Sequence, residues 1–180
     1  DGTIITRSSP VQIGSLSWSQ VSAGFGYTAA IRSDGLLFAW GYNANGELGF
    51  GDINTNYSSP VQVGSLSWNQ VSSAEGHTTA IRSDKLLFTW GLNTNGELGD
   101  GTLIGKSSPV QIGSLSWNQV SSGDQHSTAI RNDGLLFTWG YNSDGQLGNG
   151  NTTTTSSPVQ IGSLSWKQVS AGIQCTLGIK

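Results

Sequence analysis

Charged side chains are scarce in this chain of 180 residues, and their scarcity excludes one large class of function. Asp, Glu, Lys and Arg make up 11% of the residues, against about 25% in typical soluble domains. The formal net charge is −3, whereas a nucleic-acid-binding surface needs clustered Lys and Arg. The eight Lys and Arg residues are instead spread through the chain. No nucleic-acid partner is therefore expected.

Cysteine, methionine and long apolar runs are also missing or rare. Cys175 is the single cysteine, which excludes an internal disulfide and leaves the redox compartment open. Methionine is absent even at position 1. No apolar run approaches the roughly 20 residues of a membrane-spanning helix, so no membrane insertion is expected. The low charge and the abundance of Thr, Asn and Ser favour an extracellular, cell-surface or virion location over the cytoplasm.

What the chain does contain is a repeat of 49 or 50 residues. The tract S-S-P-V-Q begins at four equivalent positions, and all seven tryptophans fall in two further series: Ser8, Ser58, Ser107 and Ser156; Trp18, Trp68, Trp117 and Trp166; Trp40, Trp90 and Trp139. A repeat of this length indicates one supersecondary unit stacked several times. Residues shared by all repeats are expected to build the scaffold, so residues that differ are the better candidates for function.

Within one repeat, the local pattern predicts four short strands and no helix. Taking residues 58–106 as an example, extended runs are expected at 60–63, 68–72, 77–82 and 86–90, where β-branched and aromatic residues gather. Gly64-Ser65 is expected to end the first run, and a tight turn at 83–85 to join the last two. No stretch offers a helix-period apolar stripe of about ten residues. Four strands per repeat are typical of a β-propeller blade, so the predicted fold class is all-β, with blades of four antiparallel strands.

The same residues resemble a known family. The pattern S-P-V-Q-[IV]-G, W-x-Q-V-S and A-I-R-x-D-x-L-L-F-x-W-G-x-N-x-[ND]-G-x-L-G is similar to the regulator of chromosome condensation repeat and covers essentially the whole chain. The resemblance implies a propeller, usually of seven blades, of which this chain would supply about half. It also implies either guanine-nucleotide exchange on a small GTPase or a binding scaffold, as in bacterial, phage and multidomain members.

The repeats divide the chain into one partial β-propeller over residues 1–180. The units are 8–57, 58–106, 107–155 and an incomplete 156–180, with 1–7 as the tail of a preceding repeat. We expect a window on a longer array, in which the ring is closed by other blades of the same longer chain or by a second copy. An open half-ring would expose apolar faces, so the chain alone is not expected to be a stable monomer.

Several residue types that often carry chemistry fit structural roles better. Tyr27, His77, His126 and Cys175 share one position in successive repeats. Structural zinc ligands lie at short spacings, whereas these lie one repeat apart, so buried hydrogen bonding is expected instead of a metal site. The Asn-Gly and Asp-Gly loops at 43–47, 93–97 and 142–146 offer too few carboxylates for calcium and are expected to form turns.

The remaining charged positions and motifs do not predict an enzyme. Arg32, Arg82, Arg131 and Lys180 share one position and are expected to form surface ion pairs, with an anion-binding stripe as the alternative. The chain has no G-x-S-x-G, no G-x-x-x-x-G-K-[ST] and no H-E-x-x-H. We therefore predict no catalytic residue, no cofactor and no metal.

Two stretches vary between otherwise nearly identical repeats, and loops on a rigid scaffold are where binding residues usually lie. The first is 25–27 and its counterparts 75–77, 124–126 and 173–175, and the second is 50–57 with its counterparts. Neutral drift at exposed turns is the alternative explanation. The candidate partner-binding residues are Phe25, Tyr27, Phe50, Ile53, Tyr57, Glu75, Leu103, Ile104, Asp124 and Ile173.

The function predicted from these patterns is a non-catalytic binding or structural module. We expect it to be part of a larger bacterial or phage surface or virion protein, mediating protein–protein or receptor interaction with a protein or glycan ligand. One alternative is regulation of a small GTPase by nucleotide exchange. Another is a carbohydrate-binding propeller, for which Tyr42 and Tyr141 would supply aromatic rims.

Overall fold

The computed structural model describes residues 2–3 and 5–180. These residues form strands and no helix, which confirms the all-β class. The strands are β1 (Trp18–Ala23), β2 (Tyr27–Arg32), β3 (Leu36–Gly41), β4 (Tyr57–Ser73), β5 (His77–Arg82), β6 (Leu86–Gly91), β7 (Lys106–Ser122), β8 (His126–Arg131), β9 (Leu135–Gly140), β10 (Thr155–Ser165), β11 (Gln168–Ala171) and β12 (Thr176–Ile179).

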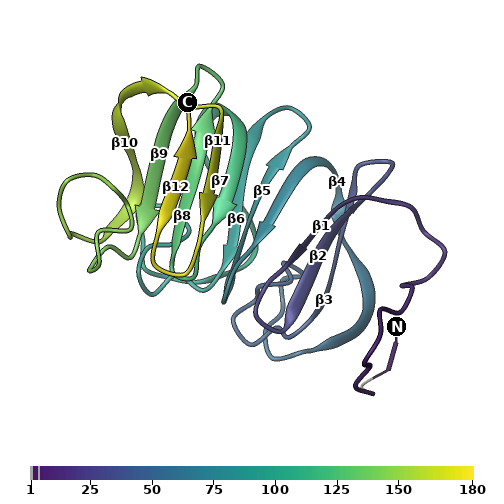
Figure 1. Ribbon diagram of the computed structural model, residues 1–180. Helices are drawn as coiled ribbons and strands as arrows, with labels where there is room; N and C mark the ends of the chain where they lie inside the picture. The colour runs from purple at the N-terminus through teal and green to yellow at the C-terminus, as the bar shows by residue number, and fades with distance from the viewer. Residues whose placement is uncertain (1, 4) are drawn as a thin grey trace.

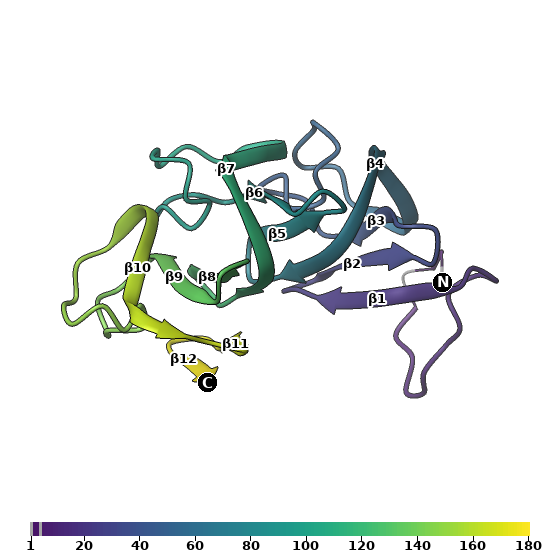
Figure 2. The ribbon, with the colours of Figure 1, turned by 90° about the horizontal axis from the view of Figure 1, so that it is seen from above.

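The strands assemble into successive antiparallel sheets, which we call blades. Blade 1 contains β1, β2, β3 and the first part of β4; blade 2 contains the rest of β4, β5, β6 and the first part of β7. Blade 3 contains the rest of β7, β8, β9 and β10, and blade 4 contains β11 and β12. The blades follow one another from the purple to the yellow end of the chain (Figure 1). They lie along an arc that is open on one side (Figure 2).

Strand β4 belongs to two blades at once, which the sequence did not predict. Tyr57 to Ser67 pair with β3, and Trp68 to Ser73 pair with β5. The expected break at Gly64-Ser65 is therefore wrong. Gly64 adopts a positive φ of 58° inside an irregularity between the pairs Leu36–Ser67 and Phe38–Gln62, and this bulge bends the strand without ending it. One continuous strand thus carries the chain from the last position of blade 1 to the first of blade 2.

Glutamine side chains hold the first strands of neighbouring blades together. Gln119 on β7 donates from Nε2 to the Val169 carbonyl over 3.0 Å, and the Val169 N–H donates to Gln119 Oε1 over 2.9 Å. Gln20 makes the same two bonds with Val71, at 3.2 and 2.9 Å. The backbone of one blade is thereby satisfied by a side chain of the preceding blade, which keeps the first strands side by side.

The apolar core lies between blades as well as within them. One buried cluster joins Leu37 and Leu48 of blade 1 to Val71 and Trp90 of blade 2. Trp90 is fully buried, and its indole Nε1 donates to the Glu47 carbonyl of blade 1 over 2.8 Å. Each blade therefore buries an apolar face against its neighbour, as stacked repeats require.

The two outermost blades keep part of this apolar surface exposed. Val21 of blade 1 is 66% exposed, whereas its counterparts Val71 and Val169 are each 2% exposed. On blade 4, Leu177 and Ile179 are 69% and 60% exposed. These are the positions that a further blade would cover. None of the described segments forms a helix with the length and apolarity that crossing a bilayer requires.

Candidate functional site

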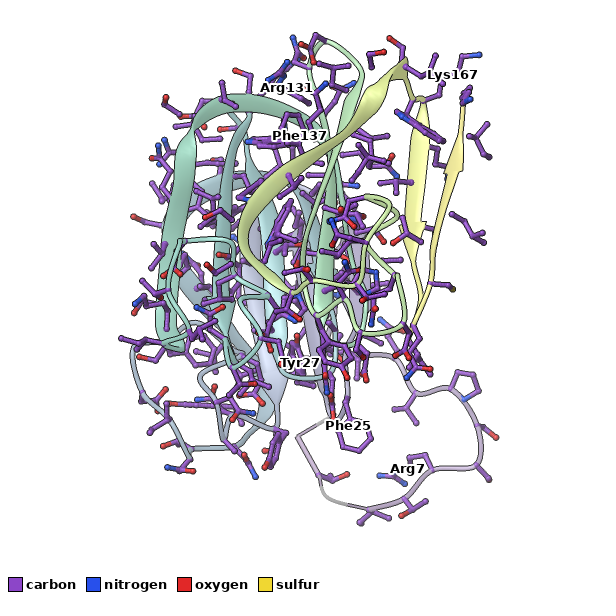
Figure 3. All side chains as sticks on the ribbon, turned by 90° about the vertical axis from the view of Figure 1, so that its left-hand side faces the viewer. Arg7, Phe25, Tyr27, Arg131, Phe137 and Lys167 are labelled. Atoms are coloured by element: carbon purple, nitrogen blue, oxygen red, sulfur yellow. The ribbon has the colours of Figure 1, made fainter. Side chains whose placement is uncertain are left out.

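The two ends of the blades carry different connections. The loops between first and second strands, at 24–26, 74–76, 123–125 and 172–175, share one end with the long connections 42–56, 92–105 and 141–154. We call this end the loop face. The opposite end carries the short turns 33–35, 83–85 and 132–134, and we call it the turn face. Phe25 lies at the loop face, and Arg131 and Lys167 lie at the turn face (Figure 3).

Charge is separated between these two faces. The loop-face connections carry most of the acidic residues, and the turn-face connections and adjoining strand ends carry most of the basic ones: Glu47, Asp52, Glu75, Glu97, Asp100, Asp124 and Asp144 on the first; Arg32, Arg82, Lys85, Arg131, Lys167 and Lys180 on the second. Lys106 is on the loop-face side, 3.5 Å from Asp100, and Arg7 lies toward the same end as Phe25 (Figure 3). Sequence reasoning missed this separation, although assigning each charge to a loop or a turn would have found it.

On the turn face, the arginines already have partners. Arg32 and Asp34 form an ion pair at 2.6 Å, and the same Arg32 lies 5.0 Å from the centre of the Phe38 ring. Blades 2 and 3 repeat this combination, so the expected row of ion pairs is confirmed. The hydrogen bond from Arg32 lowers the pKa of Asp34 below its usual value. A carboxylate and an aromatic ring thus hold each arginine.

The position shared by Tyr27, His77 and His126 is buried. The Tyr27 hydroxyl donates to the His77 carbonyl over 2.6 Å, and His77 Nε2 lies 2.8 Å from Ser127 Oγ. Burial raises the pKa of Tyr27 to about 12 and lowers the pKa of His77 to about 3. These side chains link one blade to the next, so Tyr27, a candidate partner-binding residue, is not accessible to a partner. Cys175 is exposed.

The other four loop-tip candidates line one edge of the loop face. Phe25, Glu75, Asp124 and Ile173 occupy equivalent positions in blades 1 to 4. Phe25 and Ile173 are 74% and 71% exposed, Glu75 is exposed, and Asp124 is half-buried. Because the first strands lie side by side, these four different side chains follow one another along the arc.

The candidates on the long connections divide into a packed pair and three exposed residues. The rings of Phe50 and Tyr57 meet edge to face with centres 4.9 Å apart, and the Tyr57 hydroxyl donates to Asp52 over 3.0 Å. This pair packs against the core between blades 1 and 2. Ile53, Leu103 and Ile104 are each more than half exposed and contribute apolar surface to the loop face.

A pocket of about 510 Å³ opens on the loop face between blades 1 and 2. Its side chains combine two aromatic rings, an aliphatic group, two amides and one carboxylate: Phe25, Tyr42, Leu92, Asn45, Asn56 and Glu75. Phe25 and Glu75 come from the loops that vary between repeats, whereas Asn45 and Asn56 were not predicted as site residues. The sequence places these residues up to 67 positions apart, so only the packing of the two blades brings them together.

Carboxyl groups crowd the next junction, between blades 2 and 3. Partial burial, followed by the charge of Glu75 and a hydrogen bond to it, raises the pKa of Asp124. Burial and then the Glu75 charge also raise the pKa of Glu97, which is fully buried with an unpaired Oε1. Neighbouring carboxyl groups favour a shared proton or a nearby cation.

The Asn-Gly loops act as turns. The Leu48 N–H donates to Asn43 Oδ1 over 3.1 Å, and the Asn45 N–H donates to Glu47 Oε2 over 2.7 Å. Their polar side chains therefore serve the loop's own backbone, as expected. Residues 2–3 and 5–180 include no group of three or more His, Cys, Asp or Glu side chains placed to hold a metal ion.

Sequence comparison matches most of the chain to one repeat family. The model of the regulator of chromosome condensation (RCC1) repeat matches residues 34–81, 84–130 and 133–179. A second model with the same description matches 18–47 and 117–146. A search of curated proteins found no match.

Solved structures with the same fold come from yeast, human and plant proteins. Prp20p from Saccharomyces cerevisiae superposes with a TM-score of 0.82 at 20% identity, over 91% of this chain and 44% of that one. Human WBSCR16 gives 0.58 at 19% identity, over 94% and 59%. The ectodomain of the Arabidopsis thaliana receptor kinase ACR4 gives 0.60 at 16% identity, over 91% and 49%. The chain thus spans about half the length of these proteins.

Proposed function

The chain belongs to the regulator of chromosome condensation (RCC1) repeat family, and from this we propose that it is a non-catalytic binding module whose loop face engages a protein partner. The contrast between loop tips and scaffold carries the proposal. Four equivalent loop tips present Phe25, Glu75, Asp124 and Ile173, while the strands between them are nearly identical. A frame that is repeated within the chain and displays unlike side chains is suited to recognition by loops.

Relatives with the same fold support a protein partner. The Prp20p structure is described together with binding to Gsp1p and histones, and another structure shows Prp20 bound to Kap60. We carry over to this chain only the general property of binding proteins. The exposed apolar residues Phe25, Ile53, Leu103, Ile104 and Ile173 would supply the buried centre that such an interface needs.

We further propose that the module belongs to a larger bacterial or phage surface or virion protein. The support is compositional, because charged residues make up only 11% of the chain and Thr, Asn and Ser provide the polarity of the loops. In such a protein, the loop face would contact a receptor while the turn face, with its paired arginines, would remain scaffold.

Binding experiments with face-specific variants test the proposal. Partners captured by the purified protein would be compared for a loop-face variant, Phe25→Ala with Ile173→Ser, and a turn-face control, Lys85→Ala. Lys85 is exposed, and its Nζ donates to Asn132 over 2.8 Å, so its removal should leave the fold intact. We expect a direct protein partner whose capture falls with the loop-face variant and not with the control. Equal capture by both variants would contradict the proposal.

Two other assays address the alternative functions. Release of a fluorescent nucleotide from small GTPases, measured with and without the protein, would reveal exchange activity. Binding to a panel of glycans, lost on replacing Tyr42 or Tyr141, would reveal a carbohydrate-binding propeller. A positive result in either assay with no protein partner would replace the proposed function.

A further inference from the structure

The pocket between blades 1 and 2 combines groups that recognise an organic cation. Phe25 and Tyr42 are 74% and 45% exposed, so their rings are available to a ligand. Glu75, which is also exposed, supplies a carboxylate at the pocket wall, and the amides of Asn45 and Asn56 line the pocket as well. Aromatic faces attract cations through their quadrupoles, and a carboxylate accepts charge-assisted hydrogen bonds from them.

The protein itself already uses this combination to hold arginine. On the turn face, Arg82 lies 4.8 Å from the centre of the Phe88 ring while it forms an ion pair with Asp84. Blades 1 and 3 repeat the arrangement. The pocket places rings and a carboxylate together in the same way, and none of its lining residues is basic. Its cation would therefore have to come from a ligand.

A second carboxyl group, that of Asp124, lies near Glu75 beside the pocket and adds to the negative charge there. Partial burial, and then the charge of neighbouring Glu75, raise the pKa of Asp124. Among the basic residues described on this side, Lys106 is paired with Asp100 at 3.5 Å, and Arg7 lies in the N-terminal segment. A bound cation would relieve the repulsion between Glu75 and Asp124.

The junction between blades 2 and 3 does not repeat this arrangement. At the junction between blades 2 and 3, Leu92 replaces Tyr42 and Glu75 replaces Phe25. Asn95, the counterpart of Asn45, donates from Nδ2 to Gln125 Oε1 across the junction over 3.3 Å, whereas Asn45 Nδ2 donates to Glu47 Oε1 within its own loop over 3.3 Å. The second junction therefore lacks both aromatic rings of the first.

We infer that this pocket binds a lysine or arginine side chain from a basic segment of a partner protein, with the cation held between the Phe25 and Tyr42 rings and the Glu75 carboxylate. This inference rests on the proposed function and specifies its partner. The acidic loop face would attract such a segment toward the pocket, and this electrostatic attraction would weaken as salt is added. The two exposed rings would also cover the apolar stem of the side chain.

The test uses matched peptides and the purified protein. A five-residue peptide with a central arginine would be titrated and followed by NMR, beside the same peptide with lysine, with glutamate, and with citrulline, the neutral isostere of arginine. We expect the arginine and lysine peptides to bind at least about fivefold more tightly than the citrulline peptide, since a cation over aromatic rings beside a carboxylate gains roughly 1 kcal/mol or more.

Variants that preserve the fold would place the binding in the pocket. Glu75→Gln removes the charge and should weaken the arginine peptide about threefold to tenfold. Tyr42→Leu installs the residue that blade 2 accommodates as Leu92 and should weaken it similarly. Asp144→Asn removes an exposed carboxylate from the same face of blade 3 and should change nothing.

Each outcome decides the question. Equal binding of arginine and citrulline peptides, or binding that Glu75→Gln and Asp144→Asn weaken equally, would overturn the inference. Binding of a neutral oligosaccharide that Tyr42→Leu abolishes, with none of the arginine peptide, would also overturn it. If a protein partner depends on Phe25 and Ile173 but no basic peptide binds, the proposed function stands and this inference falls. If no protein partner depends on the loop face, the proposed function falls.

Discussion

Replacing Gln119 with alanine should loosen the junction between blades 3 and 4 and leave the rest of the structure intact. Gln119 is half-buried on β7, and its side-chain amide makes two hydrogen bonds to the backbone of Val169, at 3.0 and 2.9 Å. Val169 is 2% exposed, so its N–H and carbonyl have little access to water once the amide is gone. The variant therefore removes one partner from two bonds and leaves the other partners buried.

The size of the effect follows from the number of bonds lost. A hydrogen bond contributes a net 0.5–1.5 kcal/mol on average, and two bonds give about 1–3 kcal/mol. If β11 and β12 open as a local unit, their amide hydrogens should exchange roughly 5 to 150 times faster, because about 1.4 kcal/mol corresponds to a factor of ten. Exchange in β1 to β3, which belong to blade 1, should not change.

Gln111→Ala is the matched control, because it makes the same change in the same strand. Gln111 is exposed, and its Nε2 donates only to the carbonyl of nearby Gly113, over 2.7 Å. Hydrogen exchange measured by mass spectrometry on both variants would separate the two positions. If Gln119→Ala accelerated exchange in β11 and β12 no more than Gln111→Ala, the glutamine bonds would not hold the blades together.

Three further outcomes are expected. Trp90→Phe should cost about 2–3 kcal/mol of unfolding free energy, because it leaves a small cavity and removes one of the two donors to the Glu47 carbonyl, the other being Thr78 Oγ1. Trp40→Phe, at a half-buried counterpart, should cost less in the same urea titration. The free energy of unfolding should fall by about 2 kcal/mol per buried histidine when the pH is lowered from 7 to 5. In the unfolded chain a histidine takes up a proton below about pH 6.5, whereas in the folded chain His77, with its pKa lowered to about 3, stays neutral. Glu47 acts in the opposite direction, because burial raises its pKa. The test is therefore whether His77→Gln flattens the dependence of the urea midpoint on pH. An unchanged slope would refute the contribution assigned to His77. Finally, Val21→Lys should reduce self-association of the 18.9 kDa chain in light scattering, and a wild-type protein that is already a well-behaved monomer would contradict this expectation.

Local patterns in the sequence determined which segments form strands. The turn dipeptides Asp34-Gly35 and Asp133-Gly134 and the runs of β-branched and aromatic residues specify each short strand through interactions within a few residues. Their recurrence every 49 or 50 residues then specifies a stack of equal blades. These properties need no knowledge of the neighbouring blade, so they could be predicted.

The continuity of β4 could not be predicted from the same patterns. Gly64 breaks strands in most contexts, and by itself it indicated a break. Pairing with β3 on one side and with β5 on the other keeps the strand extended through the glycine. Whether the strand continues through Gly64 therefore depends on its pairing with two separate sheets.

The accessibility of the candidate residues was also decided by tertiary structure. Phe25 and Tyr27 are two positions apart in one variable loop, yet Phe25 is 74% exposed and Tyr27 is 3% exposed, because the Tyr27 hydroxyl reaches the backbone of blade 2. Sequence variation identified the loop correctly as a place of difference. It could not say which side chain turns inward.

The sequence by itself thus determined the blade and its repetition, because both arise from short-range periodicity and turn chemistry. Only the packing of one blade on the next decided which loops meet, and with them the pocket of Phe25, Tyr42 and Glu75 and the separation of acidic from basic faces. The physical reason is that these features join residues about one repeat apart, which no local pattern relates.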